Sequence, residues 1–163
     1  MKTSSLFSKS IAAISLLALF TSPTVLSAMA YEAGGSATYI VTDSESTTHP
    51  DGTVTVIQTS KSVVVCDDET VPFHLGSQTA VGTLVMDADG NLLTTAGYLH
   101  TVDPDGDVMY IWWQGIEGGS EWGFMSGSGK YEGMEGGGTS KLISMQPDGS
   151  QVIRWHGKWT MKD

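Results

Sequence analysis

The sequence predicts an all-β protein: a single antiparallel β-barrel of about eight strands that follows an N-terminal signal peptide. Three observations predict this fold class. Short segments rich in Thr, Val, Ile, Tyr and Trp alternate with Gly, Asp, Asn and Pro, as strands alternate with turns in all-β domains. Asp-Gly pairs separate several of these segments. After residue 30, no window places apolar residues at helical spacing.

The N-terminal segment has the pattern of a secretory signal. Lys2 and Lys9 precede an apolar run over residues 11–20, and Ala28-Met29-Ala30 fits a small-x-small cleavage site. The apolar run is too short to span a bilayer. We therefore expect residues 1–30 to be a signal peptide and residues 31–163 to form one β-barrel domain. The protein is then secreted or periplasmic, with no membrane anchor after cleavage.

Charge and cysteine content narrow the function classes. The chain carries 8 Lys and Arg against 18 Asp and Glu, a net charge of −10, so no basic stripe for nucleic acid is present. Cys66 is the only cysteine, which excludes an intramolecular disulfide. We expect a buried thiol at the end of a strand; an exposed thiol that forms a mixed disulfide is the alternative.

Strand-like segments and turns follow one another along the remaining chain. Nine candidate strands cover residues 36–43, 53–59, 61–66, 80–86, 92–101, 107–114, 121–126, 139–145 and 151–160. Four Asp-Gly turns, at residues 49–53, 87–91, 103–107 and 146–150, predict hairpins and therefore an antiparallel meander. Closure into a barrel removes exposed strand edges. A sandwich is the alternative, and an outer-membrane barrel is disfavoured by the polar strands.

Side-chain parity predicts which strand faces are covered. In the segment 151–160, Trp155 and Trp159 share one face and the charged residues share the other, as in a half-buried strand. The segment 107–114 is apolar on both faces, with Tyr110 and Trp112 on one of them. This strand is expected to be covered on both sides or to line an apolar cavity.

Four residues on neighbouring strands form the candidate binding site. Tyr98, His100, Tyr110 and Trp112 are predicted to line a cavity for a small hydrophobic or aromatic ligand, with His100 as its titratable group. An aromatic stripe that only packs the core is the alternative.

Metal and cofactor sites are not predicted. Asp103, Asp105 and Asp107 resemble the start of a calcium loop, but the closing Glu is missing. We therefore interpret them as a turn, with weak calcium binding as the alternative. No histidine pair has a zinc-ligand spacing.

The glycine-rich stretch 126–141, "SGSGKYEGMEGGGTSK", lacks the spacing of a phosphate-binding loop. Strand-like segments flank it on both sides. It is expected to be a tight strand-to-strand crossing, in which glycines allow close backbone approach and Tyr131 and Met134 anchor the packing.

Three segments carry a resemblance to a known superfamily: "GTLVMDADGNLLTTAGYLHTVDPDGDVMYIWW", "GSGKYEGMEGGGT" and the closing "RWHGKWT". Together they make the chain from Gly82 to Trp159 similar to bacterial exported proteins of the allene oxide cyclase and dirigent barrel-like superfamily, which have a calycin-like shape. The resemblance implies an eight-stranded antiparallel barrel with an inner cavity. Plant members use this barrel as a cyclase or to guide radical coupling, but no motif places their catalytic carboxylates on positions of this chain.

The leading expectation for function is non-enzymatic. The barrel binds a small apolar or aromatic molecule or has a structural role. The alternative is a cofactor-free cyclase or isomerase that acts on an oxidised lipid or a phenolic substrate. A cavity without a carboxylate or histidine would favour a binding protein, whereas a titratable group at the cavity floor would favour an enzyme. A barrel filled by its own tryptophans would leave a structural role.

Overall fold

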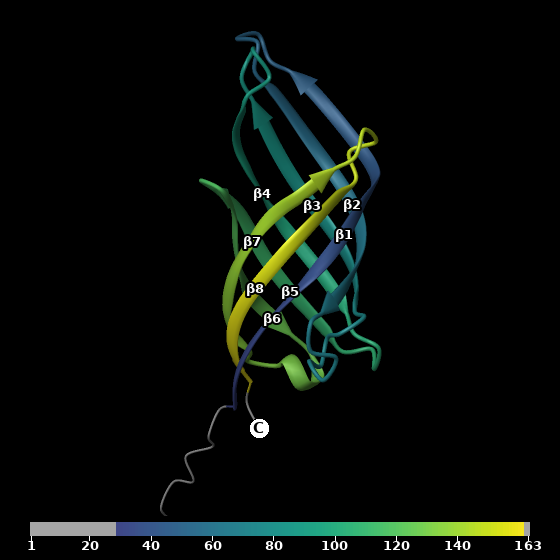
Figure 1. The fold of residues 1–163 in the computed structure, drawn as a ribbon. Coiled ribbons are helices and arrows are strands. Elements are labelled where there is room, and N and C mark those ends of the chain that lie inside the picture. Colours follow the sequence, from purple (N-terminus) through teal and green to yellow (C-terminus); the bar gives the residue numbers. More distant parts are fainter. Residues whose placement is uncertain (1–28, 162–163) are drawn as a thin grey trace, which may run out of the picture.

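The computed structural model describes residues 29–161. Eight strands form a closed barrel in sequence order, and each pairs antiparallel with its neighbours (Figure 1). The predicted fold class is confirmed. The predicted signal peptide lies outside the described residues except for Met29 and Ala30, which begin the first strand. Among residues 29–161, no helix is long and apolar enough to cross a membrane.

The strands are longer and fewer than the nine segments expected. Residues 53–59 and 61–66 belong to one strand, because Ser60 continues the alternation between them and pairs with Ala80. The first strand begins before residue 36 and continues through the polar stretch 44–48. The elements are β1 (Met29–Thr48), β2 (Val54–Cys66), β3 (Ser77–Met86), β4 (Leu92–Val102), β5 (Val108–Ile116), β6 (Gly119–Gly127), the 3-10 helix η1 (Gly129–Tyr131), β7 (Glu135–Met145) and β8 (Gln151–Met161).

The connections divide between two ends of the barrel. The β1–β2, β3–β4, β5–β6 and β7–β8 hairpins lie at one end, which we call the open end and which is uppermost in Figure 1. The β2–β3, β4–β5 and β6–β7 connections lie at the other, which we call the closed end. All four predicted Asp-Gly turns join consecutive strands, as expected. Their glycines have positive φ, at Gly52, Gly90, Gly106 and Gly149, a conformation that costs glycine little.

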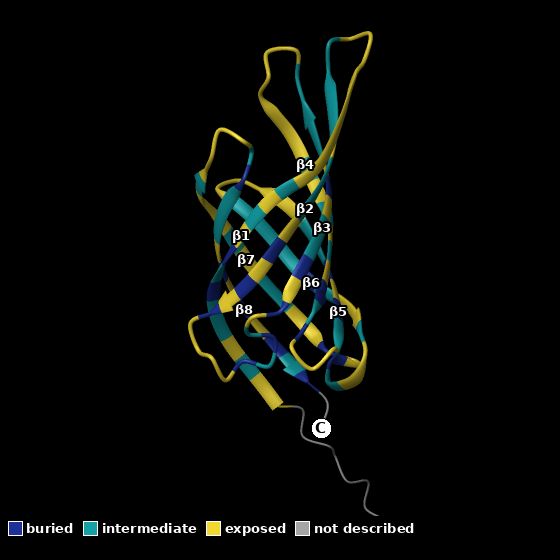
Figure 2. Cartoon of the chain, turned by 90° about the vertical axis from the view of Figure 1, so that its right-hand side faces the viewer, coloured by how far each residue is buried: buried dark blue, intermediate teal, exposed yellow. Residues whose placement is uncertain are grey.

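The open end is uneven. Pairing between β1 and β8 stops at Tyr39 and Gln151, whereas pairing between β1 and β2 continues to Thr48 and Val54. The β1–β2 and β3–β4 hairpins therefore reach beyond the other two, and their tips are exposed (Figures 1 and 2).

A hydrophobic core fills the closed end. Its buried members come from the strands, from the β2–β3 loop and from the glycine-rich stretch: Val64, Cys66, Val71, Phe73, Met109, Tyr131, Met134, Trp155, Trp159 and Met161. Tyr131 and Met134 are 0% and 6% exposed, so their predicted role as packing anchors is confirmed. A Cβ on Gly137 or Gly138 would collide with backbone carbonyl oxygens of the neighbouring strands. The glycines thus allow β6, β7 and β8 to approach closely.

The single cysteine belongs to this core. Cys66 is buried at the end of β2, as expected, and the exposed alternative is wrong. Burial, with the nearby charges of Asp67 and Asp68, raises the pKa of the Cys66 thiol to about 12. The thiol is therefore protonated at neutral pH and weakly nucleophilic.

Candidate ligand cavity and the closed end of the barrel

A cavity of about 460 Å³ occupies the barrel interior above the closed-end core. Phe73, Met109 and Trp155 belong both to this core and to the cavity lining, so they form the floor. Leu92 and Met145 line the cavity near the hairpins and are 55% and 57% exposed. Because residues that line the cavity there also reach solvent, the cavity opens at the open end.

One side of the cavity is aromatic. Trp113 of β5 and Trp122 and Phe124 of β6 line it. Two strand glycines make room for Trp113: a Cβ on Gly82 would lie 2.6 Å from its Cζ2 atom, and one on Gly97 would lie 2.9 Å from its Cε2 atom. The indole therefore packs directly against the β3 and β4 backbones and is held in place by them.

The other side is polar but uncharged. Tyr39, Gln58, Ser60, Gln78 and Gln151 line it from four adjacent strands, β8 and β1–β3; we call this set the polar strip. The Tyr39 hydroxyl donates to Gln78 Oε1 at 2.9 Å. Burial raises the pKa of Tyr39 well above its ordinary value, so the group stays a neutral hydroxyl. The strip offers amide and hydroxyl groups to a ligand.

The described residues that line the cavity include no Asp, Glu, His, Lys or Arg. A charged ligand would lose its hydration there and find no counter-ion, which is costly. An uncharged ligand does not incur this cost. No carboxylate or imidazole of the described lining is placed to transfer a proton to or from a bound molecule.

The four residues predicted to form the site lie together, but on the outer surface. Tyr98 pairs with Trp112 and His100 with Tyr110 across β4 and β5, and none of the four lines the cavity. Since side chains alternate between the two faces of a strand, the cavity receives their neighbours of opposite parity. That they bind a ligand stays a prediction, now for an outer face.

The residues that do line the cavity at this position are Leu99, Ile111 and Trp113. Sequence reasoning missed them because β5 is apolar on both faces. The glycines opposite Trp113 are a signal for its inward direction, but Gly123 lies opposite Trp112 in the same way. The pattern alone therefore does not choose between the faces.

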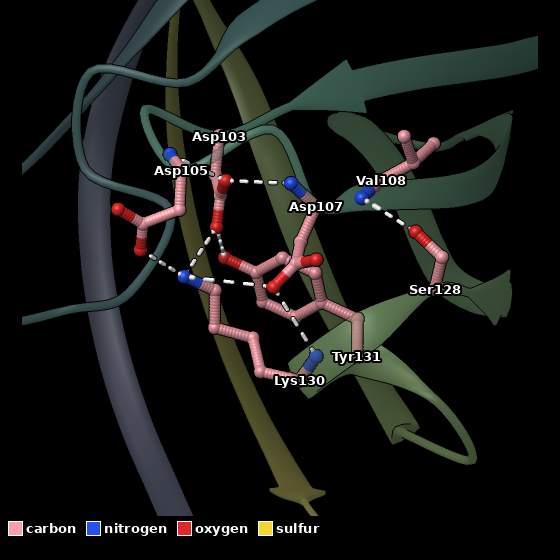
Figure 3. A network of polar contacts seen from close by, with 7 residues as sticks. All are labelled: Asp103, Asp105, Asp107, Val108, Ser128, Lys130 and Tyr131. Carbon is pink, nitrogen blue, oxygen red and sulfur yellow. Dashed lines mark hydrogen bonds and ion pairs between the residues drawn. The ribbon is translucent and has the colours of Figure 1, made fainter.

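The aspartates of the β4–β5 turn form a polar network with η1 at the closed end (Figure 3). The Lys130 ammonium lies 2.7 Å from Asp103 Oδ2, 2.5 Å from Asp105 Oδ2 and 3.8 Å from Asp107 Oδ2. The Tyr131 hydroxyl donates to Asp103 Oδ2 at 2.8 Å. The network joins the turn to the glycine-rich stretch and thereby fixes the core residue Tyr131.

Protonation states follow from these contacts. Burial of Asp103 disfavours its charged form, but hydrogen bonds from Lys130 and Tyr131 and from the Asp107 N–H together hold its pKa below the ordinary value. Asp103 and Asp105 raise the pKa of Lys130. Burial, followed by the Asp103 hydrogen bond, raises the pKa of Tyr131 above its ordinary range. At neutral pH the network is a carboxylate held by an ammonium and a neutral phenol.

The same network bears on the calcium alternative. The Lys130 ammonium already supplies positive charge to all three aspartates, and Asp103 Oδ1 accepts the N–H groups of Asp105 and Asp107. These are the contacts of a capped turn. Across the part of the chain that the structure describes, no three His, Cys, Asp or Glu side chains are arranged to hold a metal ion.

Comparisons with known proteins support the fold. No family model matches the chain, and no curated protein sequence matches it. Among solved structures, the pterocarpan synthase dirigent protein GePTS1 is 14% identical, with a TM-score of 0.59 over 87% of this chain and 98% of that chain. The pterocarpan synthase dirigent protein PsPTS1 is also 14% identical, with a TM-score of 0.45 over 83% of this chain and 97% of that chain.

The chain thus has the barrel fold of a dirigent protein, which confirms the fold that the sequence resemblance implied. At 14% identity this likeness is evidence for a shared fold and not for a shared function, since one fold serves many functions.

Proposed function

We propose that the protein is a binding protein that takes one small, uncharged and largely apolar or aromatic molecule into its barrel. The observation that carries the proposal is the open cavity of about 460 Å³, with no ionisable Asp, Glu, His, Lys or Arg among its described lining residues. Cavities of this size and composition are typical of small-molecule sites.

The two sides of the cavity define the ligand class further. Trp113, Trp122 and Phe124 offer ring surfaces to an aromatic ligand. Opposite them, Gln58, Ser60 and Gln151 offer hydrogen-bonding groups to hydroxyl or carbonyl oxygens. An oxygenated aromatic molecule, such as a neutral phenol, suits both sides. GePTS1, whose fold this chain shares, is named a pterocarpan synthase dirigent protein.

An enzymatic role would require another source of catalysis. The floor residues Phe73, Met109 and Trp155 supply no general acid or base. A cofactor-free cyclase or isomerase would here act by holding a flexible substrate in one conformation. No contact in the cavity favours that role over binding, so binding is the proposal.

A fluorescence titration tests the proposal with two matched probes. The uncharged 2-naphthol and the anionic 2-naphthoate share a ring system and differ in charge at neutral pH. We expect 2-naphthol to quench the tryptophan emission saturably, and 2-naphthoate to bind at least about tenfold more weakly, a difference of about 1.4 kcal/mol. Equal binding of the two probes, or binding of neither, would contradict the proposal.

Two neighbouring residues provide matched variants. Ala80 lines the cavity, whereas Val81 is 47% exposed and lies on the opposite face of β3. Ala80→Phe should abolish 2-naphthol binding by filling the cavity, and Val81→Phe should leave it unchanged. Retention of 2-naphthol binding in Ala80→Phe would place the probe outside the cavity.

We further propose that the protein is exported, as the N-terminal pattern indicates. N-terminal sequencing of protein from its host should begin at Tyr31. An N-terminus at Met1 would refute processing.

A further inference from the structure

The outer face of β4 and β5 carries an aromatic patch that the cavity does not use. The outer aromatic patch consists of Tyr98 and His100 on β4 with Tyr110 and Trp112 on β5. Tyr98 is 61% and Tyr110 is 46% exposed. Both tyrosines are among the large side chains that the outside of the barrel exposes.

The four residues form a two-by-two grid on the sheet. Tyr98 faces Trp112 and His100 faces Tyr110 across the strand pair, with Cβ atoms about 5 Å apart. Along each strand, residues two apart are separated by roughly 7 Å. The His100 and Tyr110 ring centroids are 5.2 Å apart at 33°. The patch therefore presents several ring surfaces side by side over a gently twisted sheet.

The surface beneath the grid holds Trp112 in place. A Cβ on Gly123 would lie 2.7 Å from Trp112 Nε1, so the indole occupies the space that this glycine leaves on β6. A ring positioned before a ligand arrives loses less conformational freedom on binding. The patch is in this sense preorganised.

The residues paired directly with the patch are uncharged, and two of them carry hydroxyl groups. Its cross-strand neighbours are Thr79 and Val81 on β3 and Gly123 and Ser126 on β6. None of these bears a carboxylate, an ammonium or a guanidinium group, on a chain whose net charge is −10. The patch is therefore complementary to an uncharged partner that carries hydroxyl groups.

The size of the patch separates two kinds of neutral partner. An aromatic side chain has about 200 Å² of surface, so Tyr98 and Tyr110, at 61% and 46% exposed, together present roughly 200 Å². The exposed His100 and the partly buried Trp112 bring the four rings to less than about 500 Å². A stable protein interface needs about 800 Å² from each partner. The patch is too small for that, but its spacing suits a few sugar rings. The apolar C–H faces of pyranose rings stack on aromatic faces, whose quadrupole attracts them.

We propose that the outer aromatic patch binds an uncharged, extended polysaccharide of the β-1,4-linked type, with pyranose rings stacked on Tyr98 and Tyr110. Extended chains of this type can follow a row of rings along a gently twisted sheet. The hydroxyls of Ser126 and of the two tyrosines then hydrogen-bond to sugar hydroxyls. The patch lies on the outside of strands whose other face lines the cavity, so glycan and cavity ligand bind without competing.

Retention on insoluble microcrystalline cellulose and insoluble chitin tests this proposal. The wild-type protein should be retained on at least one of them at both about 0.15 M and about 1 M NaCl, since stacking of neutral groups is not screened by salt. The Tyr98→Thr/Tyr110→Thr variant should bind about tenfold more weakly, which corresponds to about 1.4 kcal/mol. Thr keeps a high strand propensity.

A matched control removes two equally exposed apolar side chains elsewhere. Leu93 and Ile143 are 58% and 63% exposed, and Leu93→Thr/Ile143→Thr should be retained like the wild type. Both double variants should still bind 2-naphthol, which separates this site from the cavity. Three results would overturn the proposal. The first is retention of the wild-type protein no greater than that of serum albumin, and the second is loss of its retention at about 1 M NaCl. The third is a Tyr98→Thr/Tyr110→Thr variant that is retained as strongly as the wild type.

Discussion

The substitution Asp103→Asn tests the network that closes one end of the barrel. The Asp103 side chain is 0% exposed, and its Oδ2 atom accepts from Lys130 at 2.7 Å and from Tyr131 at 2.8 Å. Its Oδ1 atom accepts the N–H groups of Asp105 and Asp107 at 2.9 and 3.0 Å. Asparagine can keep the two backbone bonds, but it places an NH₂ group against the lysine and the tyrosine.

The expected cost follows from these contacts. Removing one member of a buried ion pair costs about 3–5 kcal/mol, and Lys130 keeps Asp105 as a partner, so we expect about 3 kcal/mol, at the lower limit. Tyr131→Phe removes one hydrogen bond to a charged acceptor that keeps three donors, which should cost about 1.5 kcal/mol. Because both substitutions break the same contact, the double variant should cost about 3 kcal/mol rather than the sum.

Urea unfolding followed by tryptophan fluorescence measures all three values. Asp105→Asn is the matched control, because Asp105 contacts the same ammonium but its side chain is 77% exposed; exposed pairs contribute little, so its midpoint should not change. A cost below about 1 kcal/mol for Asp103→Asn, or additive costs in the double variant, would refute the reasoning.

The remaining predictions concern acid stability, a strand glycine and the thiol. Since the pKa of Asp103 is lowered on folding, its contribution is present above about pH 4 and is lost as the pH falls further; acid melts of the wild type should fall more steeply than those of Asp103→Asn, and parallel curves would argue against this. Gly97→Ala places a Cβ against the Val81 carbonyl oxygen and 2.9 Å from Trp113 Cε2 and should cost roughly 1–3 kcal/mol; an unchanged urea midpoint would contradict this close approach. Cys66, with its pKa raised to about 12, should react with iodoacetamide far more slowly in the folded than in the urea-unfolded protein, and equal rates would show an accessible thiol.

Much of the fold could be predicted from local chemistry. The Asp-Gly turns mark hairpins because glycine accepts positive φ, and Gly52, Gly90, Gly106 and Gly149 all have it. Parity in β8 correctly separates the buried Trp155 and Trp159 from the charged outer face, because one face of that strand is polar. Both predictions depend on neighbours in the chain.

The candidate site could not be predicted in the same way. β5 has Tyr110 and Trp112 on one face and Ile111 and Trp113 on the other, so hydrophobicity does not distinguish inside from outside. Closure of the barrel decides which face of β5 turns inward, because it places Gly82 and Gly97 against the Trp113 indole. The polar strip and the Lys130 contacts also join residues far apart in the sequence. Such contacts leave no periodic signal in the chain.

The central claim, that the cavity holds a small uncharged molecule, is tested most directly by native mass spectrometry of protein purified from its own host. The claim predicts one reproducible bound species that is absent from Ala80→Phe and retained in Val81→Phe. A single unliganded mass for the wild type, together with no response to neutral aromatic probes in solution, would contradict it.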